Sequence, residues 1–160
     1  MKIRKKTIAK NNRPRIAVIG VGNLLLKDEG IGIHVAQALE KMDLPAGVRI
    51  IDGGTSPDVL AYTGATEKLI IVDAARGGGA PGEVYRLSPA DLASDSSSFS
   101  VHELGVEQSL KMMSLAGEKP KEVIIIAVEP KEIGWGTELS AELKLKLPQV
   151  VGIVLKEIGA

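Results

Sequence analysis

The stretch VIGVGNLLLKDEGIGIHVAQAL, residues 18–39, decides the fold because an apolar run leads there into a glycine turn and then into a helical pattern. Residues 15–20, an apolar run after Arg15, predict a buried strand. Beyond the turn, residues 30–42 predict a helix with one apolar stripe, formed by Ile31, Val35, Leu39 and Met42. A strand, a glycine turn and a helix in this order are typical of the first unit of an α/β fold.

The turn Gly20-Val21-Gly22 is similar to the glycine turn of dinucleotide-binding proteins, but the following residues depart from that pattern. Leu25 stands where the third glycine would be, and the helix does not open directly from the turn. Asp28 and Glu29 lie where a phosphate would bind and would repel it. A nucleotide-binding α/β enzyme stays open as an alternative because Asp52 ends the second predicted strand, where a ribose-binding acid would stand.

Strands and helices alternate along the rest of the chain. Further strands are predicted at residues 48–52, 68–74, 82–87 and 122–128. Helices are predicted at 56–65 and 103–115, and a helix interrupted near Pro148 at 139–158, whereas the polar stretch 88–100 is predicted to be a loop. The predicted fold class is α/β: a three-layer α/β/α arrangement with a twisted, mostly parallel sheet of about five strands between helices.

Composition bounds the kind of protein. The 160 residues are enough for one domain, predicted at 15–160, and the absence of cysteine excludes disulfides and thiolate metal sites. Only four residues are aromatic, so the core must consist of aliphatic side chains. No apolar stretch approaches the roughly 18 residues that span a bilayer. We therefore expect a cytoplasmic protein with no membrane partner.

The zero net charge hides an asymmetry. Residues 1–15 carry seven Lys or Arg and no acid, and the remaining chain carries thirteen bases and twenty acids, a net charge of −7. Residues 1–14 are interpreted as a solvated basic extension, because the charges are not interleaved with aromatic side chains. The acidic body argues against nucleic acid as a partner, since it would repel the phosphate backbone.

Reactive side chains follow the predicted strand ends, where ligands gather in α/β folds. Glu29 follows the first strand, Asp73 ends the third, and His102 stands beyond the polar stretch. Ser100 and Glu103 have capping-box spacing, which would place His102 at a helix N-terminus where the helix dipole favours a neutral imidazole. Two carboxylates and a neutral imidazole suit a divalent metal ion, so Glu29, Asp73 and His102 are predicted to form a metal site.

Each of these residues also has a simpler interpretation. Asp28 is predicted to be a helix N-cap, and Glu29 alone would be a favourable charge in a first helical turn. Asp73 alone would cap a turn, and a single His102 is more often a surface residue. His34 lies within the first predicted helix and is assigned a structural or surface role. Backbone conformations with positive φ are expected at the glycines Gly20, Gly22, Gly53 and Gly54.

Five segments together resemble the hydrogenase maturation endopeptidases. They are GVGNLLLKDEGIGIHVAQAL, DGGTSPDVL, LIIVDAARGGGAPG, SVHELGV and VIIIAVEP, which occur in the order found in that family. The resemblance implies the same α/β fold. It also implies an enzyme that removes the C-terminal extension from the precursor of a nickel-iron hydrogenase large subunit, after nickel has been inserted.

The same resemblance implies that Glu29, Asp73 and His102 contact nickel and carry the reaction. The nickel would be supplied by the precursor, so no permanent cofactor is expected. The expected partner is the hydrogenase large-subunit precursor. A metal-binding maturation chaperone that senses nickel without peptidase activity stays as a third hypothesis, beside the nucleotide-binding enzyme.

Overall fold

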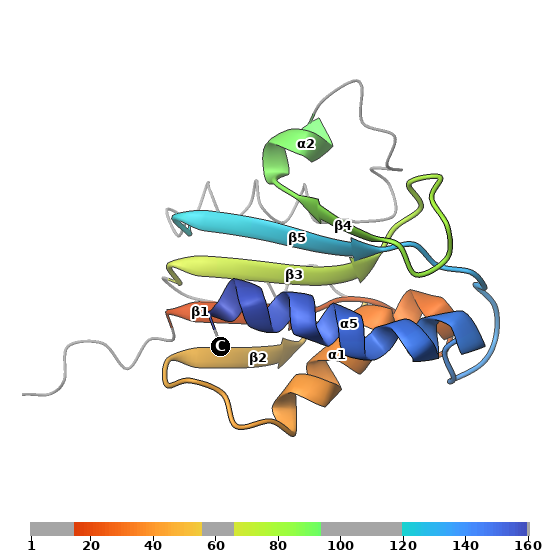
Figure 1. Cartoon of the computed structure of the whole chain (residues 1–160), viewed down its shortest axis with the longest axis horizontal. Helices are drawn as coiled ribbons and strands as arrows, with labels where there is room; N and C mark the ends of the chain where they lie inside the picture. Colours follow the sequence, from red (N-terminus) through yellow and green to blue (C-terminus); the bar gives the residue numbers. More distant parts are fainter. Residues whose placement is uncertain (1–14, 56–65, 94–119, 160) are drawn as a thin grey trace, which may run out of the picture.

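The computed structural model describes residues 15–55, 66–93 and 120–159, which contain a five-stranded sheet of order β2-β1-β3-β5-β4 (Figure 1). The strands are β1 (Ile16–Gly20), β2 (Val48–Asp52), β3 (Lys68–Ala74), β4 (Val84–Leu87) and β5 (Glu122–Val128). The helices are η1 (Lys27–Gly30), α1 (Ile31–Glu40), α2 (Pro89–Ala93) and α5 (Ala141–Ile158). Strands β1, β2, β3 and β5 are parallel, and β4 pairs antiparallel with β5 at the edge.

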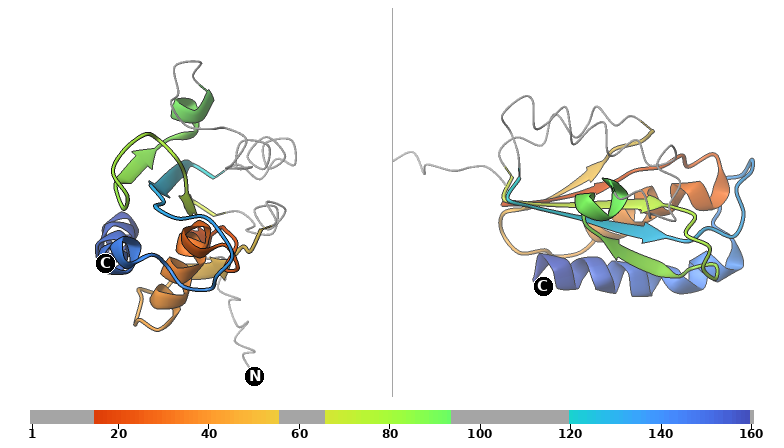
Figure 2. Two further views of the ribbon diagram at one scale, coloured as in Figure 1. Left: turned by 90° about the vertical axis from the view of Figure 1, so that its right-hand side faces the viewer. Right: turned by 90° about the horizontal axis from the view of Figure 1, so that it is seen from above.

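Both faces of the sheet are buried. Helices α1 and α5 lie together on one face (Figure 2), where Val18 of β1 and Ile70 of β3 belong to the same apolar cluster. A second cluster on the other face combines Ile19 and Ile71 with Leu92 of α2. The predicted α/β class with a mostly parallel sheet is therefore confirmed. The basic extension 1–14 and the predicted helices 56–65 and 103–115 lie outside the described residues.

Helix α1 is shorter than the sequence predicts. It ends at Glu40, and the backbone N–H of Met42 donates to the carbonyl of Leu39 at 3.0 Å, which closes the last turn. Met42 is 43% exposed, so its assignment to the apolar stripe was wrong. The buried stripe does include Ile31 and Val35 as predicted.

Helix α5 runs unbroken through Pro148, and the predicted interruption was wrong. Proline inside a helix costs about 3 kcal/mol because it cannot donate the N–H bond and crowds the preceding turn. Burying one large aliphatic side chain contributes roughly 1.5–3 kcal/mol. Five apolar side chains of α5 are buried against the core and outweigh that cost: Leu143, Val150, Val151, Val154 and Ile158.

A short helix, α2, lies within the stretch 88–100 that was predicted to be a loop. Pro89 occupies its first position, where a missing N–H costs nothing. The N–H and the hydroxyl of Ser88 both donate to Asp91 Oδ2, at 2.7 and 3.0 Å. Residues 88–91, Ser-Pro-Ala-Asp, therefore begin the helix with a capping arrangement in which Asp91 bonds back to Ser88. None of the helices in the described ranges is long and apolar enough to cross a bilayer.

Candidate functional site

The glycine turn after β1 joins the carboxyl ends of three strands. The Val21 N–H donates to the carbonyl of Val72 in β3 at 2.9 Å. The Gly22 N–H donates to the carbonyl of Gly54, beyond β2, also at 2.9 Å. These main-chain bonds fix the loop that leads to η1 against the neighbouring strand ends, so acidic residues from separate segments come to one edge of the sheet.

Gly22 allows the turn to pack directly against the backbone of Glu29. Its φ is +152°, and a Cβ built on it would lie 2.1 Å from the Glu29 carbonyl oxygen. The Asn23 N–H donates to the same carbonyl at 3.3 Å. The prediction of positive φ is confirmed at Gly22 and also at Gly54, whose φ is +53°. Gly22 therefore determines where the chain carries Glu29.

Gly20 and Gly53 are required for a different reason from the predicted one. Neither is among the residues with positive φ. A Cβ on Gly20 would lie 2.1 Å from the carbonyl oxygen of Gly32 in α1, and one on Gly53 would lie 2.9 Å from Ile19 Cγ2. At these two positions glycine permits close approach, of α1 to the end of β1 and of the turn to the core.

Two of the three predicted site residues are described, and both lie at this edge. Asp73, in β3, is 4% exposed, and its Oδ1 accepts a 2.8 Å hydrogen bond from the Ala74 N–H. Glu29 is half-buried in η1, which packs against β3. His102 lies outside the described residues. Within the described ranges no three His, Asp or Glu side chains are grouped closely enough to hold a metal, so the three-residue site stays a prediction.

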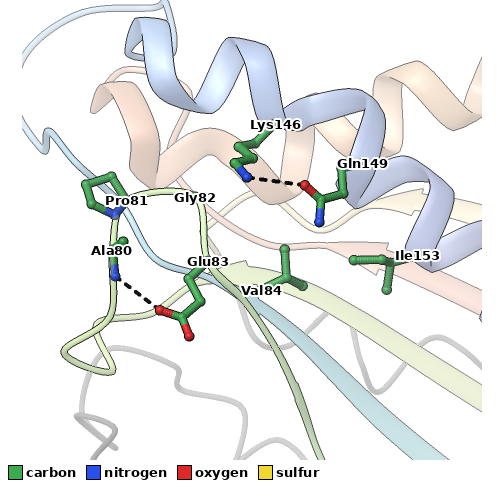
Figure 3. Close-up of a pocket in the computed structure, with 8 residues that line it drawn as sticks. All are labelled: Ala80, Pro81, Gly82, Glu83, Val84, Lys146, Gln149 and Ile153. Atoms are coloured by element: carbon green, nitrogen blue, oxygen red, sulfur yellow. Dashed lines mark hydrogen bonds between the residues drawn. The ribbon is translucent and has the colours of Figure 1, made fainter.

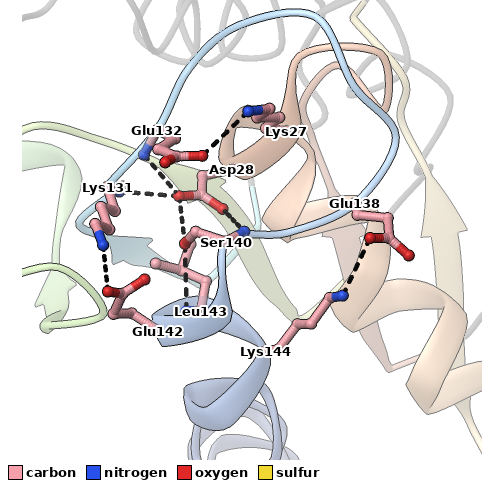
Figure 4. A network of polar contacts seen from close by, with 9 residues as sticks. All are labelled: Lys27, Asp28, Lys131, Glu132, Glu138, Ser140, Glu142, Leu143 and Lys144. Atoms are coloured by element: carbon pink, nitrogen blue, oxygen red, sulfur yellow. Dashed lines mark hydrogen bonds and ion pairs between the residues drawn. The ribbon is translucent and has the colours of Figure 1, made fainter.

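Asp28 is not the helix N-cap that the sequence predicts. The N-cap of α1 is Gly30, and no side chain caps it. The Asp28 carboxylate is instead fully buried and accepts four hydrogen bonds from the segment before α5 (Figure 4). The donors are the N–H groups of Lys131 (3.0 Å), Glu132 (2.8 Å) and Ser140 (2.7 Å) and the hydroxyl of Ser140 (2.8 Å).

This network ties η1 to the start of α5. Ser140 is the N-cap of α5, and its hydroxyl accepts from the Leu143 N–H at 3.5 Å (Figure 4). Through these bonds Asp28, which immediately precedes Glu29, holds η1 against the N-terminus of α5. Burial alone would raise the pKa of Asp28, but the hydrogen bonds from Glu132, Ser140 and Lys131 outweigh it and hold the pKa below its ordinary value.

Asp28→Asn is expected to lower the free energy of unfolding at pH 7 by about 3 kcal/mol, because an amide NH₂ would face an N–H donor that the carboxylate now satisfies. A lowered folded-state pKa contributes stability above the ordinary aspartate pKa of 3.8, and this is lost as pH falls through the folded-state pKa. Urea unfolding of parent and variant from pH 7 to pH 2 should therefore show that the difference between their free energies of unfolding becomes smaller as the pH falls. Asp43→Asn, at an exposed acid after α1, is the control; an equal effect there, or a difference independent of pH, would contradict the assignment.

A third buried acid, Glu129, holds the glycine loop that follows Asp73. Its Oε2 accepts from the Gly77 N–H at 2.7 Å and from the Tyr85 hydroxyl at 2.9 Å. The Tyr85 oxygen accepts from the Gly79 N–H at 3.0 Å. Burial, followed by the hydrogen bond to Glu129, raises the pKa of Tyr85, so the phenol stays protonated and can donate. The motif VIIIAVEP contains Glu129, but its partners could not be inferred from the sequence.

A pocket of about 430 Å³ lies between the 80–84 loop and α5 (Figure 3). Its polar groups already bond to one another: the Ala80 N–H donates to Glu83 Oε2 at 3.1 Å, and Lys146 Nζ donates to Gln149 Oε1 at 3.4 Å. Neither Glu29 nor Asp73 lines it. This pocket is not the site to which the strand ends point.

His34 lies in α1, as predicted, and its Nε2 is buried without a hydrogen-bond partner among the described residues. Burial lowers its pKa, against the opposing effect of the Asp28 charge, so the neutral form is favoured. These observations fit the predicted structural role.

The fold and the strand-end acids define an α/β protein with a carboxylate-bearing edge held by main-chain bonds. A family model, hydrogenase maturation protease (HycI), matches residues 33–157. The chain therefore belongs to the hydrogenase maturation protease family and is a peptidase. The resemblance seen in the sequence is confirmed.

Individual relatives match over most of their length. The hydrogenase 2 maturation protease of Escherichia coli (strain K12) is 36% identical over 153 residues, which cover 91% of this chain and 93% of that protein. The hydrogenase expression/formation protein HoxM of Azotobacter vinelandii is 31% identical over 148 residues, or 89% of this chain and 72% of that protein.

Solved structures agree with the sequence comparisons. The hydrogenase maturating endopeptidase HybD of Escherichia coli superposes with a TM-score of 0.78 at 32% identity and covers 91% of this chain and 92% of its own. HybD of Thermococcus kodakarensis, a [NiFe] hydrogenase maturation protease, has a TM-score of 0.77 at 30% identity, and the match covers 90% of this chain and 99% of that one. Membership of a protease family decides against the nucleotide-binding enzyme and the chaperone without peptidase activity.

Proposed function

We propose that this endopeptidase acts in the cytoplasm on the precursor of a nickel-iron hydrogenase large subunit and removes its C-terminal extension after nickel insertion. We further propose that Glu29, Asp73 and His102 contact the nickel that the precursor carries. In this proposal nickel is part of the substrate, and the enzyme needs no resident metal.

The observation that carries the proposal is the convergence of two acids on one edge of the sheet. The carbonyl oxygen of Glu29 lies against Gly22. The N–H of Val21, the residue before Gly22, donates to the carbonyl of Val72, and Asp73 is the next residue of β3. The two carboxylates thus come from separate segments that main-chain contacts join. Oxygen donors of this kind suit a divalent cation, and adding an imidazole gives a mixed donor set that suits nickel.

This arrangement fits recognition of a metal held by another protein. Asp73 is buried and fixed by the Ala74 N–H, whereas Glu29 is only half-buried and stays accessible from the edge. Carboxylates that share one metal repel each other when the cation is absent, so in this proposal a nickel-loaded precursor would be favoured over an empty one. A divalent ion at that point polarises a nearby carbonyl, which assists attack by water.

The proposal is tested by incubating the purified protein with its large-subunit precursor in nickel-loaded and nickel-free forms. Mass spectrometry should show that only the loaded precursor loses a C-terminal peptide and that the enzyme is not consumed. Equal cleavage of both forms would contradict nickel recognition. Stable binding of the loaded precursor without any change in mass would contradict the proposed cleavage.

A further inference from the structure

Three exposed apolar residues, Leu25, Ile133 and Trp135, lie on the two segments that meet at the Leu26–Gly136 bridge, and we call them the Trp135 surface. Trp135 is the only tryptophan of the chain and is 84% exposed, while Leu25 is 55% and Ile133 is 42% exposed. Tryptophan has a large apolar area, and it is among the residues most enriched where proteins bind each other. Exposed apolar residues gathered on paired segments are typical of sites where proteins bind each other.

The Trp135 surface is built on paired backbone. The Gly136 N–H donates to the Leu25 carbonyl at 2.9 Å, and the Lys27 N–H donates to the Gly136 carbonyl at 2.8 Å. These bonds make a parallel bridge between Leu26 and Gly136, and its register places Leu25 opposite Trp135. A surface fixed in this way loses little conformational entropy on binding.

The Asp28 network supports the same two segments. Asp28 accepts from the N–H groups of Lys131 and Glu132, which immediately precede Ile133. Lys27 and Glu132 form a 3.1 Å ion pair whose side chains are 37% and 51% exposed (Figure 4). An apolar centre next to exposed charge is the usual anatomy of a protein–protein interface.

The position of the Trp135 surface points to its occupant. Leu25 precedes Glu29 by four residues, and Figure 2 shows residues 21–30 and 129–140 together at the carboxyl edge of the sheet. A protein seated on Leu25 and Trp135 would therefore lie beside Glu29. A second copy of this chain in that place would obstruct access to Glu29. The pocket beside α5 is not lined by Leu25, Ile133 or Trp135.

We propose that the Trp135 surface is the docking surface for an apolar patch on the folded large-subunit precursor, next to the nickel and the tail to be removed. This inference rests on the proposed function. Docking on a fixed apolar surface would hold a protein substrate while Glu29 reaches its metal. The Trp135 surface would then contribute to recognition of the precursor and not to bond cleavage.

Trp135→Ala should raise KM for the nickel-loaded precursor about tenfold or more and change kcat little, because truncating a central interface tryptophan removes binding energy. The thermal midpoint should stay close to that of the parent, since the side chain is exposed. Leu145→Ala is the matched control: Leu145 is an apolar residue of α5, 83% exposed. A KM unchanged by Trp135→Ala, or raised equally by Leu145→Ala, would overturn the inference.

A direct binding measurement uses the single tryptophan. The full chain labelled with 5-fluorotryptophan should give one protein ¹⁹F resonance, and this should shift when unlabelled nickel-loaded precursor is added. A resonance that shifts with the concentration of the protease alone would identify a second copy as the occupant and overturn the inference. If the parent fails to cleave the precursor, the proposed function fails, while the titration still reports whether Trp135 is contacted.

Discussion

Glu29→Gln is expected to abolish conversion of nickel-loaded precursor to the mature large subunit, while the thermal midpoint stays within a few degrees of the parent. The substitution keeps the size and shape of the side chain, removes its charge and replaces one acceptor oxygen by an NH₂ donor. Glu29 is half-buried in η1, and the contacts that fix this segment involve its backbone and the neighbouring Asp28. The fold should therefore tolerate the change, but a site with few donors has no replacement for a lost carboxylate.

The control for Glu29→Gln is Glu138→Gln in the segment before α5, where the side chain is 81% exposed and pairs only with Lys144 among the described residues, at 3.3 Å. This variant should process at the parental rate, as should His34→Ala, whereas His102→Ala should fail on loaded precursor. If Glu29→Gln or His102→Ala processes like the parent, the assignment of Glu29, Asp73 and His102 is wrong.

Gly22→Ala is expected to reduce processing more than tenfold and to lower the thermal midpoint by several degrees. A β-carbon at positive φ costs about 1–2 kcal/mol. Here it would also lie 2.1 Å from the Glu29 carbonyl oxygen, so the segment that carries Glu29 must move. Processing assays and thermal unfolding on the same preparation would measure both effects.

Gly78→Ala separates backbone strain from displacement of Glu29. Gly78 has a φ of +83°, and a Cβ there would meet nothing within 4 Å. This variant should carry the backbone cost alone and keep processing close to the parental rate. A Gly22→Ala variant as active as Gly78→Ala would show that the turn does not position the site.

The strands could be predicted from the sequence because burial on both faces leaves a plain signal. Continuous apolar runs at residues 69–72 and 123–128 form the centres of the predicted strands 68–74 and 122–128, and the structure forms β3 and β5 over those predicted ranges. Helix limits were less predictable. The apolar periodicity predicted that α1 reaches Met42, because the spacing of apolar residues does not show where a helix stops packing on the sheet. The unfavourable effect of proline inside a helix predicted an interruption of α5 at Pro148, because that prediction did not include the packing of the neighbouring residues on the core.

The candidate site was predictable only where it follows from strand order. Placing acids after parallel strands brought Glu29 and Asp73 to one edge, as the structure shows. Asp28 was assigned wrongly because its partners Lys131 and Ser140 lie 103 and 112 residues away along the chain. A local pattern contains no information about contacts of that separation. The nearby Ser140 was predicted only as part of a helix, not as a partner of the site.

Helix α5 has a practical consequence for attaching this protein to a surface. It begins beside Asp28 and ends where Lys68 Nζ, at the first residue of β3, donates to the Glu157 carbonyl at 2.7 Å. Its 18 residues span about 27 Å at 1.5 Å per residue, from the acidic edge to the opposite end of the sheet. A biotin tag or resin linker joined after Gly159 would therefore orient every immobilised molecule with its acidic edge outward, free to capture precursor from solution.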